Sequence, residues 1–325
     1  MTGRFEYPFR SHYATVDGVR LHYLDEGTGP AIWLMHGMPM WSYVWRKLIP
    51  PLVASGYRVF APDLMGFGLS DKPVGEGAHT LKRHEALMTG LIEQLGLKDI
   101  IVAGQDWGGP IALRYAIRNK DNVRALVVFN TFVERFPKNQ RERKARDIIT
   151  RPLPRAYTFL FKNGAFSSLM ARRLDVFRAF VWLRWRTGNP SKSLGAGFRR
   201  PVDPRVMAEY RRPHDTPAKR AGIAAFAKLI PDHADHPNAA CIDEIRRQLT
   251  GWRIPMLVIW PDGDMAWKPD EGQRIARLVP DSEFHLVHHA GHYQQEDAGE
   301  EIASRMIRFM DTRVARTSVL PTESS

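Results

Sequence analysis

Asp106 is the residue whose setting most clearly suggests chemistry. It lies in the run GQDWGG, from Gly104 to Gly109, between a short apolar run and a segment with helical periodicity. Small residues around a central side chain permit the tight strand-to-helix turn called a nucleophile elbow, which raises that side chain out of a sheet. Alternatively, an aspartate here could cap the amino end of the following helix. The run therefore indicates either a carboxylate nucleophile or a helix cap.

Two further reactive groups follow later apolar runs. His292 lies in the run AGHYQQED, and two acids, Asp262 and Asp264, lie in the run WPDGD. Loops that follow parallel strands converge on the carboxyl edge of a sheet, where α/β enzymes keep their sites. The order nucleophile, acid, histidine is also that of the α/β-hydrolase triad. These positions are therefore candidates for a single site.

The elements that must position these groups alternate along the chain. A strand hairpin is predicted over 13–24, around the turn signal Asp17-Gly18. Buried strands that alternate with helices predict an α/β fold with a mostly parallel central sheet flanked by helices. Pro50 and Pro51 should disturb the first helix. The predicted strands are 31–35, 58–61, 100–103, 124–129, 256–260 and 284–289, and the predicted helices are 44–54, 81–95, 108–118, 270–278 and 300–310.

The alternation stops in the middle of the chain, where helix-like pieces are broken by prolines. An insertion of this kind could be a lid over a site, although an interaction module would leave the same pattern. We predict four parts, which are a first core segment 1–130, a helical cap 131–250, a second core segment 251–314 and a tail 315–325.

The composition limits the class of protein. The chain has 325 residues, of which 44% are hydrophobic, and a net charge of +12. This charge is uneven, since residues 135–220 have a net charge of +16 and the rest of the chain has a net charge of −4. We interpret the basic stretch as a solvated helical face rather than a nucleic-acid site, because no aromatic-basic motif accompanies it.

Cellular location and assembly are less constrained by the sequence. No apolar run approaches the roughly 20 residues that span a bilayer, so no membrane span is expected. The first nine residues lack the features of a secretory signal, and the lone Cys241 cannot form an internal disulfide. We expect a cytoplasmic location, and the sequence does not predict an oligomeric state.

Three motifs together resemble those of the haloalkane dehalogenases. They are HGMP followed by WSYVWR (36–46), PDLMGFGLSDKP (62–73) and GQDWGGP (104–110). The likeness is close over 20–130 and 254–310 and looser between them, where YRRP (210–213) is the clearest match. The glutamine before Asp106 favours dehalogenases over the related epoxide hydrolases, which more usually have histidine there.

The resemblance implies a mechanism and no cofactor. Asp106 would be the nucleophile, His292 the base and Asp264 its acid partner. Displacement of halide would form an alkyl ester on Asp106, and water activated by His292 would hydrolyse it to an alcohol. The backbone N–H groups of Met38 and Trp107 would stabilise the oxyanion. The implied partners are a small haloalkane and water.

The choice of acid rests on position. Asp264 falls where the family has its acid in a strand-Gly-x-x-Asp pattern, with Pro261 in place of the glycine, so we favour it over Asp262. Some relatives instead carry a glutamate after the strand that precedes the cap, where this chain has Asn130-Thr131. His285, His288 and His289 suggest a metal site, but we interpret them as strand residues because no other ligand cluster has suitable spacing.

One departure affects the halide site. Dehalogenases stabilise the leaving halide with two side-chain N–H donors, of which Trp107 would be one. In many relatives the second is an asparagine at the position of Met38, and a thioether has no N–H to donate. Other relatives use a tryptophan of the cap, for which Trp182 and Trp185 are candidates, although both are expected to be apolar anchors.

Two other functions stay open. An epoxide hydrolase would use the same triad but needs cap tyrosines to protonate the opening ring, with Tyr157 and Tyr210 as candidates. A noncatalytic binding protein could keep the same pocket, but retention of all three triad positions argues against it.

Overall fold

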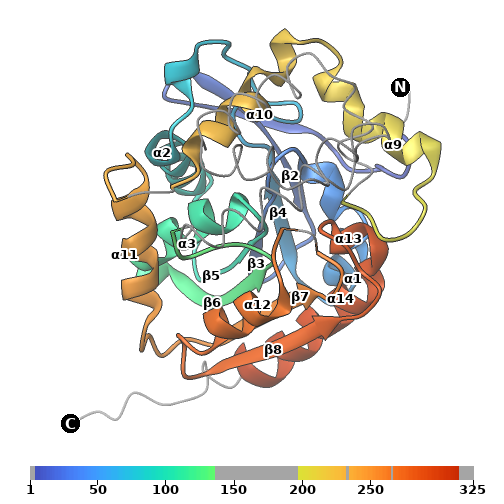
Figure 1. The fold of residues 1–325 in the computed structure, drawn as a ribbon. Helices are drawn as coiled ribbons and strands as arrows, with labels where there is room; N and C mark the ends of the chain where they lie inside the picture. The colour runs from blue at the N-terminus through green and yellow to red at the C-terminus, as the bar shows by residue number, and fades with distance from the viewer. Residues whose placement is uncertain (1–3, 136–196, 232–233, 265, 315–325) are drawn as a thin grey trace, which may run out of the picture.

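The protein is built around one mostly parallel sheet (Figure 1). The computed structural model describes residues 4–135, 197–231, 234–264 and 266–314. The strand order is β1-β2-β4-β3-β5-β6-β7-β8, with β2 antiparallel to both neighbours and every other neighbouring pair parallel. This confirms the predicted α/β fold. The strands are β1 (His12–Val16), β2 (Val19–Glu26), β3 (Ala31–Met35), β4 (Arg58–Pro62), β5 (Ile100–Gly104), β6 (Val123–Phe129), β7 (Met256–Pro261) and β8 (Ser282–Val287).

The strand order creates a switch point beside β3. The chain passes from β3 to β4 in one direction across the sheet, and from β5 through β6 to β7 in the other. Right-handed crossovers therefore place the connecting helices on opposite faces of the sheet. The loops after β3 and β5 diverge at this point, which is where open α/β sheets bind their ligands.

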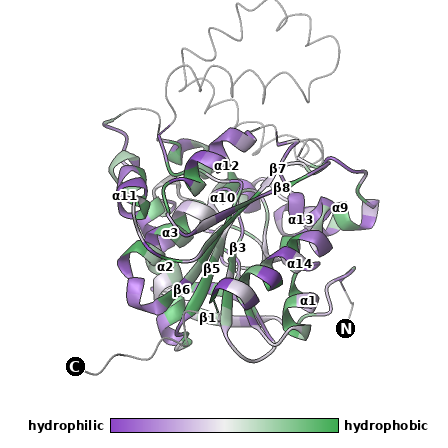
Figure 2. Ribbon diagram, turned by 90° about the horizontal axis from the view of Figure 1, so that it is seen from below, coloured by the Kyte–Doolittle hydropathy of each residue, from purple (hydrophilic) through white to green (hydrophobic). Residues whose placement is uncertain are grey.

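Helices cover the sheet as the crossovers require. α2 and α11 both pack against α3, while α1 packs against α14. Every residue of β3 and β5 is buried, and Figure 2 shows the central strands as hydrophobic. The helices are α1 (Ile49–Ala54), α2 (Leu81–Gln94), α3 (Gly108–Arg118), α9 (Pro204–Arg211), α10 (Ala221–Phe226), α11 (Ala239–Leu249), α12 (Pro269–Ala276), α13 (Gln294–Asp297) and α14 (Gly299–Phe309).

Two sequence predictions need correction. The segment 44–54 is not one helix, because a 3-10 turn at Ser42–Trp45 ends before α1 begins, and the prolines occupy the first turn of α1, where no intrahelical N–H is needed. The last strand ends at Val287, so His288 and His289 lie in the loop beyond it and only His285 is a strand residue.

The predicted cap can be described only in part. The described residues within 131–250 include α9, α10 and α11, and α11 packs against α3. Tyr157, Trp182, Trp185, most of the basic stretch and the predicted tail lie outside the described residues, so the four-part division stays a prediction. Within the described part of the chain, no helix is both long enough and apolar enough to cross a membrane.

Candidate active site

The turn after β5 has the geometry of a nucleophile elbow. Asp106 has a positive φ of 51°, which is uncommon for a residue with a side chain. The turn is fixed by its backbone, since the Asp106 N–H donates to the Asn130 carbonyl (3.0 Å) and the Thr131 hydroxyl donates to the Asp106 carbonyl (2.6 Å). Gly108 is required because a Cβ there would lie 2.3 Å from the Met35 carbonyl oxygen.

Asp106 does not cap the helix that follows. The N-cap residue of α3 is Trp107, and no side chain accepts a capping hydrogen bond there. The helix-cap alternative is therefore wrong, and the carboxylate is directed to the carboxyl edge of the sheet.

Backbone N–H groups hold the Asp106 carboxylate. The N–H of Met38, in the loop after β3, donates to Asp106 Oδ1 at 2.9 Å, and the N–H of Trp107 also hydrogen-bonds the carboxylate. Asp106 Oδ2 lies 3.7 Å from His292 Nε2. Burial raises the pKa of Asp106 above its ordinary value, although His292 and the two N–H groups oppose this. The switch point thus supplies a buried carboxylate and the donors that face it.

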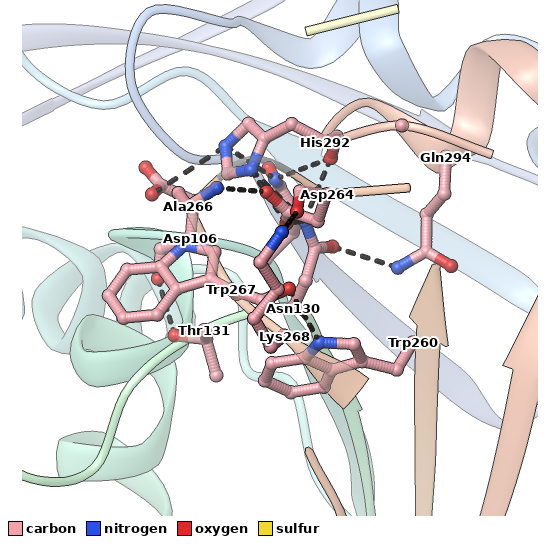
Figure 3. A network of polar contacts seen from close by, with 12 residues as sticks. Asp106, Asn130, Thr131, Trp260, Asp264, Ala266, Trp267, Lys268, His292 and Gln294 are labelled. Carbon is pink, nitrogen blue, oxygen red and sulfur yellow. Dashed lines mark hydrogen bonds and ion pairs between the residues drawn. The ribbon is translucent and has the colours of Figure 1, made fainter. Parts of the chain in front are cut away.

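His292 connects this carboxylate to a buried acid (Figure 3). Its Nδ1 lies 3.0 Å from Oδ2 of Asp264, which follows β7 and is completely buried. Oδ1 of Asp264 accepts the N–H of Ala266 at 2.7 Å. Burial is the largest single influence on each group and favours its neutral form, but the other contacts together outweigh it. The pKa of Asp264 is lowered by His292 and by hydrogen bonds from Asn130 and Ala266, and the pKa of His292 is raised by Asp264 and Asp106. A proton on Nδ1 leaves the Nε2 lone pair facing Asp106.

The structure separates the two candidate acids. Asp262 lies on the outer side of the same loop, where its Oδ2 accepts the His289 N–H at 3.1 Å and lies 3.4 Å from His288 Nδ1. Asp264 alone of the two contacts His292.

Three buried carboxamides, Gln105, Asn130 and Gln294, surround the histidine, and none of them is a residue that the sequence predicted for the site. Nδ2 of Asn130 donates to Asp264 Oδ2 (2.7 Å) and to the His292 carbonyl (2.8 Å). Nε2 of Gln294 donates to the side-chain Oδ1 of Asn130 at 2.8 Å (Figure 3). Nε2 of Gln105 donates to the His292 backbone carbonyl at 3.3 Å. Gln105 and Gln294 lie one and two positions from Asp106 and His292 in the sequence, which is the signal that could have identified them, whereas Asn130 lies in the loop after β6 and is far along the chain from all three triad residues. Together they fix the ring and backbone of the histidine.

Aromatic rings border the nucleophile. The Trp107 ring meets Phe132 and Phe226 edge to face, at centroid distances of 5.0 and 5.4 Å. Phe226 belongs to α10, within the predicted cap. Met38 is partly buried beside the core. This surface is apolar, as an uncharged organic substrate requires.

The remaining candidates do not join the site. The Tyr210 hydroxyl donates to Glu296 Oε2 at 2.8 Å, so its proton is engaged away from the triad. His285 lies 3.0 Å from Glu301, and no cluster of three or more metal-ligating side chains occurs among the described residues.

Comparison with known proteins gives consistent results. The family model for the alpha/beta hydrolase fold matches residues 30–299. A haloalkane dehalogenase of Mycobacterium marinum is 35% identical over 314 residues, covering 93% of this chain and 94% of that protein. A cis-3-alkyl-4-alkyloxetan-2-one decarboxylase of Shewanella oneidensis is 28% identical over 321 residues, covering 98% of this chain and 93% of that protein. The crystal structure of the haloalkane dehalogenase DatA from Agrobacterium tumefaciens C58 superimposes with a TM-score of 0.73 at 23% identity, covering 94% of this chain and 97% of that one.

Proposed function

The chain belongs to the haloalkane dehalogenase family of the α/β-hydrolase fold, and from its site we propose that it hydrolyses haloalkanes to an alcohol and a halide ion. The observation that carries this proposal is the placement of Asp106 at the elbow, with one carboxylate oxygen held by backbone N–H and the other 3.7 Å from His292 Nε2. An aspartate in this place can attack a saturated carbon and form an ester, which a histidine-activated water can then cleave.

The first step uses the oxygen that faces the histidine. The Met38 N–H occupies Oδ1, so Oδ2 is the oxygen available to displace halide from carbon. A new C–O bond forms as the carbon–halogen bond breaks, and the halide leaves with the electron pair. The indole N–H of Trp107 is the side-chain donor that we assign to the departing halide. The aromatic surroundings keep water away from the displacement.

The second step returns the enzyme to its starting state. A water molecule gives a proton to His292 Nε2 and its oxygen bonds to the ester carbonyl carbon. The bond between that carbon and the alkoxy oxygen then breaks, and the alkoxide takes a proton from His292 and leaves as the alcohol. The carboxyl group on Asp106 releases its remaining proton to solvent, which balances the halide ion. The oxyanion forms on the oxygen that Met38 N–H already holds, with Trp107 N–H as the second donor. Asp264 stabilises the imidazolium, and Asn130 keeps Asp264 aligned with it. Each part of the site thus acts at the atom where charge develops.

Other activities are separated by one assay. Because Met38 offers no second side-chain donor to a halide, epoxide hydrolysis, which needs no halide site, is the alternative function. The similarity to an oxetan-2-one decarboxylase adds β-lactones to the substrates to be tested. Purified protein should be incubated with bromo- and chloroalkanes, an epoxide and an oxetan-2-one, and halide, diol and carbon dioxide release followed. We expect halide release without diol. Diol or carbon dioxide alone would refute the proposal, and no turnover of any substrate would favour the noncatalytic alternative.

Trapping of the ester tests the nucleophile itself. In the His292→Phe variant the ester should form but persist, so the intact protein gains the mass of the alkyl group on a peptide that contains Asp106. Asp106→Asn is the matched control and should gain no mass. An adduct on another peptide would show that the nucleophile is misassigned.

The setting of the enzyme follows from the same features. The substrates are a small haloalkane and water, and we propose a reducing compartment such as the cytoplasm, because the only cysteine, Cys241, is buried and unpaired.

A further inference from the structure

We propose that Asp297, together with the chain segment 197–200, positions His292 for the hydrolysis of the ester. The inference rests on the proposed function and assigns a role to a carboxylate that does not touch the reacting atoms. Asp297 is the last residue of α13, five positions beyond His292. It is a positioning residue because it reaches His292 only through backbone: directly through Gly291, and through the segment 197–200 to Tyr293.

The carboxylate of Asp297 ties two distant pieces of backbone together. It is 5% exposed, and its Oδ2 accepts the N–H of Gly291 at 2.8 Å and that of Arg199 at 3.0 Å. Its Oδ1 accepts the N–H of Arg200 at 3.1 Å. Hydrogen bonds to an ionised acceptor are about twice as strong as neutral ones, so this three-way contact is a strong constraint. One of its three donors belongs to the residue immediately before His292.

A second set of contacts holds the residue after His292. The Tyr293 N–H donates to the Gly197 carbonyl at 3.1 Å, and the Phe198 ring packs on the Tyr293 ring at 4.9 Å. A Cβ on Gly291 would lie 2.5 Å from the Gly197 carbonyl oxygen, so the two backbones approach as closely as glycine permits. Asp297 therefore holds the residue before His292, and the segment 197–200, which Asp297 also binds, holds the residue after it.

Helix α13 is itself anchored, so Asp297 is presented from a fixed support. Its neighbour Glu296 accepts two hydrogen bonds from the Arg46 guanidinium, at 2.6 and 2.9 Å, and one from the Tyr210 hydroxyl. Lys47 Nζ adds a contact of 2.8 Å to the Glu296 carboxylate. Loss of the Asp297 acceptors should therefore loosen the loop around His292 while α13 stays in place.

The two reaction steps depend on His292 to different degrees. Ester formation needs Asp106 and the halide donors, whereas hydrolysis needs Nε2 aligned with water and the ester carbon. A misplacement of about 1 Å can reduce a rate by about a hundredfold. The position of His292 should therefore matter mainly in the second step.

The experiment compares Asp297→Asn with Asp262→Asn. Each change removes one carboxylate charge, from the loop after β7 or from the end of α13, and each carboxylate accepts a backbone N–H. Asp262, however, binds His289 and not the residues beside His292. Rapid-quench and stopped-flow single turnovers give the rates of ester formation and hydrolysis separately. Asp297→Asn should slow hydrolysis at least tenfold (about 1.4 kcal/mol), with formation changed less than twofold, so the ester accumulates. Asp262→Asn should change neither rate more than twofold.

Two further measurements keep the inference open to refutation. Asp297→Glu retains the charge but displaces the acceptor by one methylene, and it should show the same selective slowing of hydrolysis. This variant provides the test if Asp297→Asn does not fold. The imidazole titration of His292, followed by NMR without substrate, should move to lower pH in the Asp297 variants and less in Asp262→Asn, because the contact with Asp264 loosens. Two outcomes in the Asp297 variants would overturn the role of Asp297. One is equal slowing of ester formation and hydrolysis, and the other is that neither rate nor the titration of His292 changes. Absence of any ester in the wild type would instead refute the proposed function, while the titration would still test the positioning.

Discussion

The charge of Asp106 should control the proton affinity of His292, and esterification should remove that charge. In the resting protein both Asp264 and Asp106 raise the pKa of His292 against the effect of burial. An ester on Asp106 is neutral, so only Asp264 remains to stabilise the imidazolium. The pKa of His292 should therefore fall once the ester has formed, which frees the base for the step that needs it.

The distance between the two groups sets the size of this effect. Asp106 Oδ2 and His292 Nε2 are 3.7 Å apart. With an effective dielectric constant between about 80 and about 20, a charge pair at that distance interacts by about 1 to 4 kcal/mol, or about one to three pKa units. The pKa at which the hydrolysis rate falls on acidification should therefore lie below the pKa of His292 in the resting protein by this amount.

Two measurements test this prediction. NMR gives the resting pKa of His292, and single-turnover hydrolysis of the accumulated ester across pH gives its value in the intermediate. Asp106→Asn provides a matched control, because the amide is neutral like the ester. The pKa of His292 in this variant should lie below that in the wild type by the same amount. An inflection for hydrolysis at or above the resting value, or an unchanged titration in Asp106→Asn, would refute the reasoning.

Three further predictions concern the halide site, acid stability and the elbow. Met38→Asn should strengthen bromide and chloride binding by about 1.5 to 3 kcal/mol if a second donor is lacking, as read from quenching of tryptophan fluorescence, and an unchanged affinity would mean that another group already donates. Burial lowers the pKa of His214 to about 3, so the unfolded chain takes up a proton between about pH 6.5 and 3 that the folded protein does not. This histidine should lower the free energy of unfolding by up to about 1.4 kcal/mol per pH unit on acidification through that range, and urea denaturation should show a flatter dependence in His214→Gln. Gly108→Ala should destabilise the fold by about 3 kcal/mol or more, because the new Cβ would lie 2.3 Å from the Met35 carbonyl, whereas thermal melting of Gly75→Ala, where nothing lies within 4 Å, should be nearly unchanged.

The fold could be predicted where local pattern and burial agree. The strand Ala31–Met35 and the helix Gly108–Arg118 have the predicted bounds, since one is a continuous buried run and the other begins directly after the elbow. The segment 44–54 was predicted wrongly because its apolar residues fit a helix, yet Ser42–Trp45 forms a separate turn before the prolines start α1. The end of β8 was placed two residues late, because a run of histidines and apolar residues does not mark where pairing with β7 stops.

The site was predictable only as far as chain order defines it. The positions of Asp106 and His292 follow from the loops after β5 and β8, but Asp262 and Asp264 are two residues apart and only the turn after β7 decides which reaches the histidine. The contact of Asn130 with His292 joins residues 162 positions apart, and no local pattern encodes it. Such contacts depend on the packing of the sheet edge as a whole.

The conformation of Asp106 has a consequence for selection on stability. Its φ of 51° is one that glycine adopts freely. Most residues with a side chain lose about 1 to 2 kcal/mol in left-handed backbone, and aspartate and asparagine, which tolerate it better than the others, still adopt it less readily than glycine. Its carboxylate is also buried, which disfavours the charged form. The residue that the proposed chemistry needs is therefore not the residue that the backbone and its surroundings prefer. A library selected for heat resistance alone should enrich glycine or asparagine at this position, and the resulting proteins would be more robust and inactive.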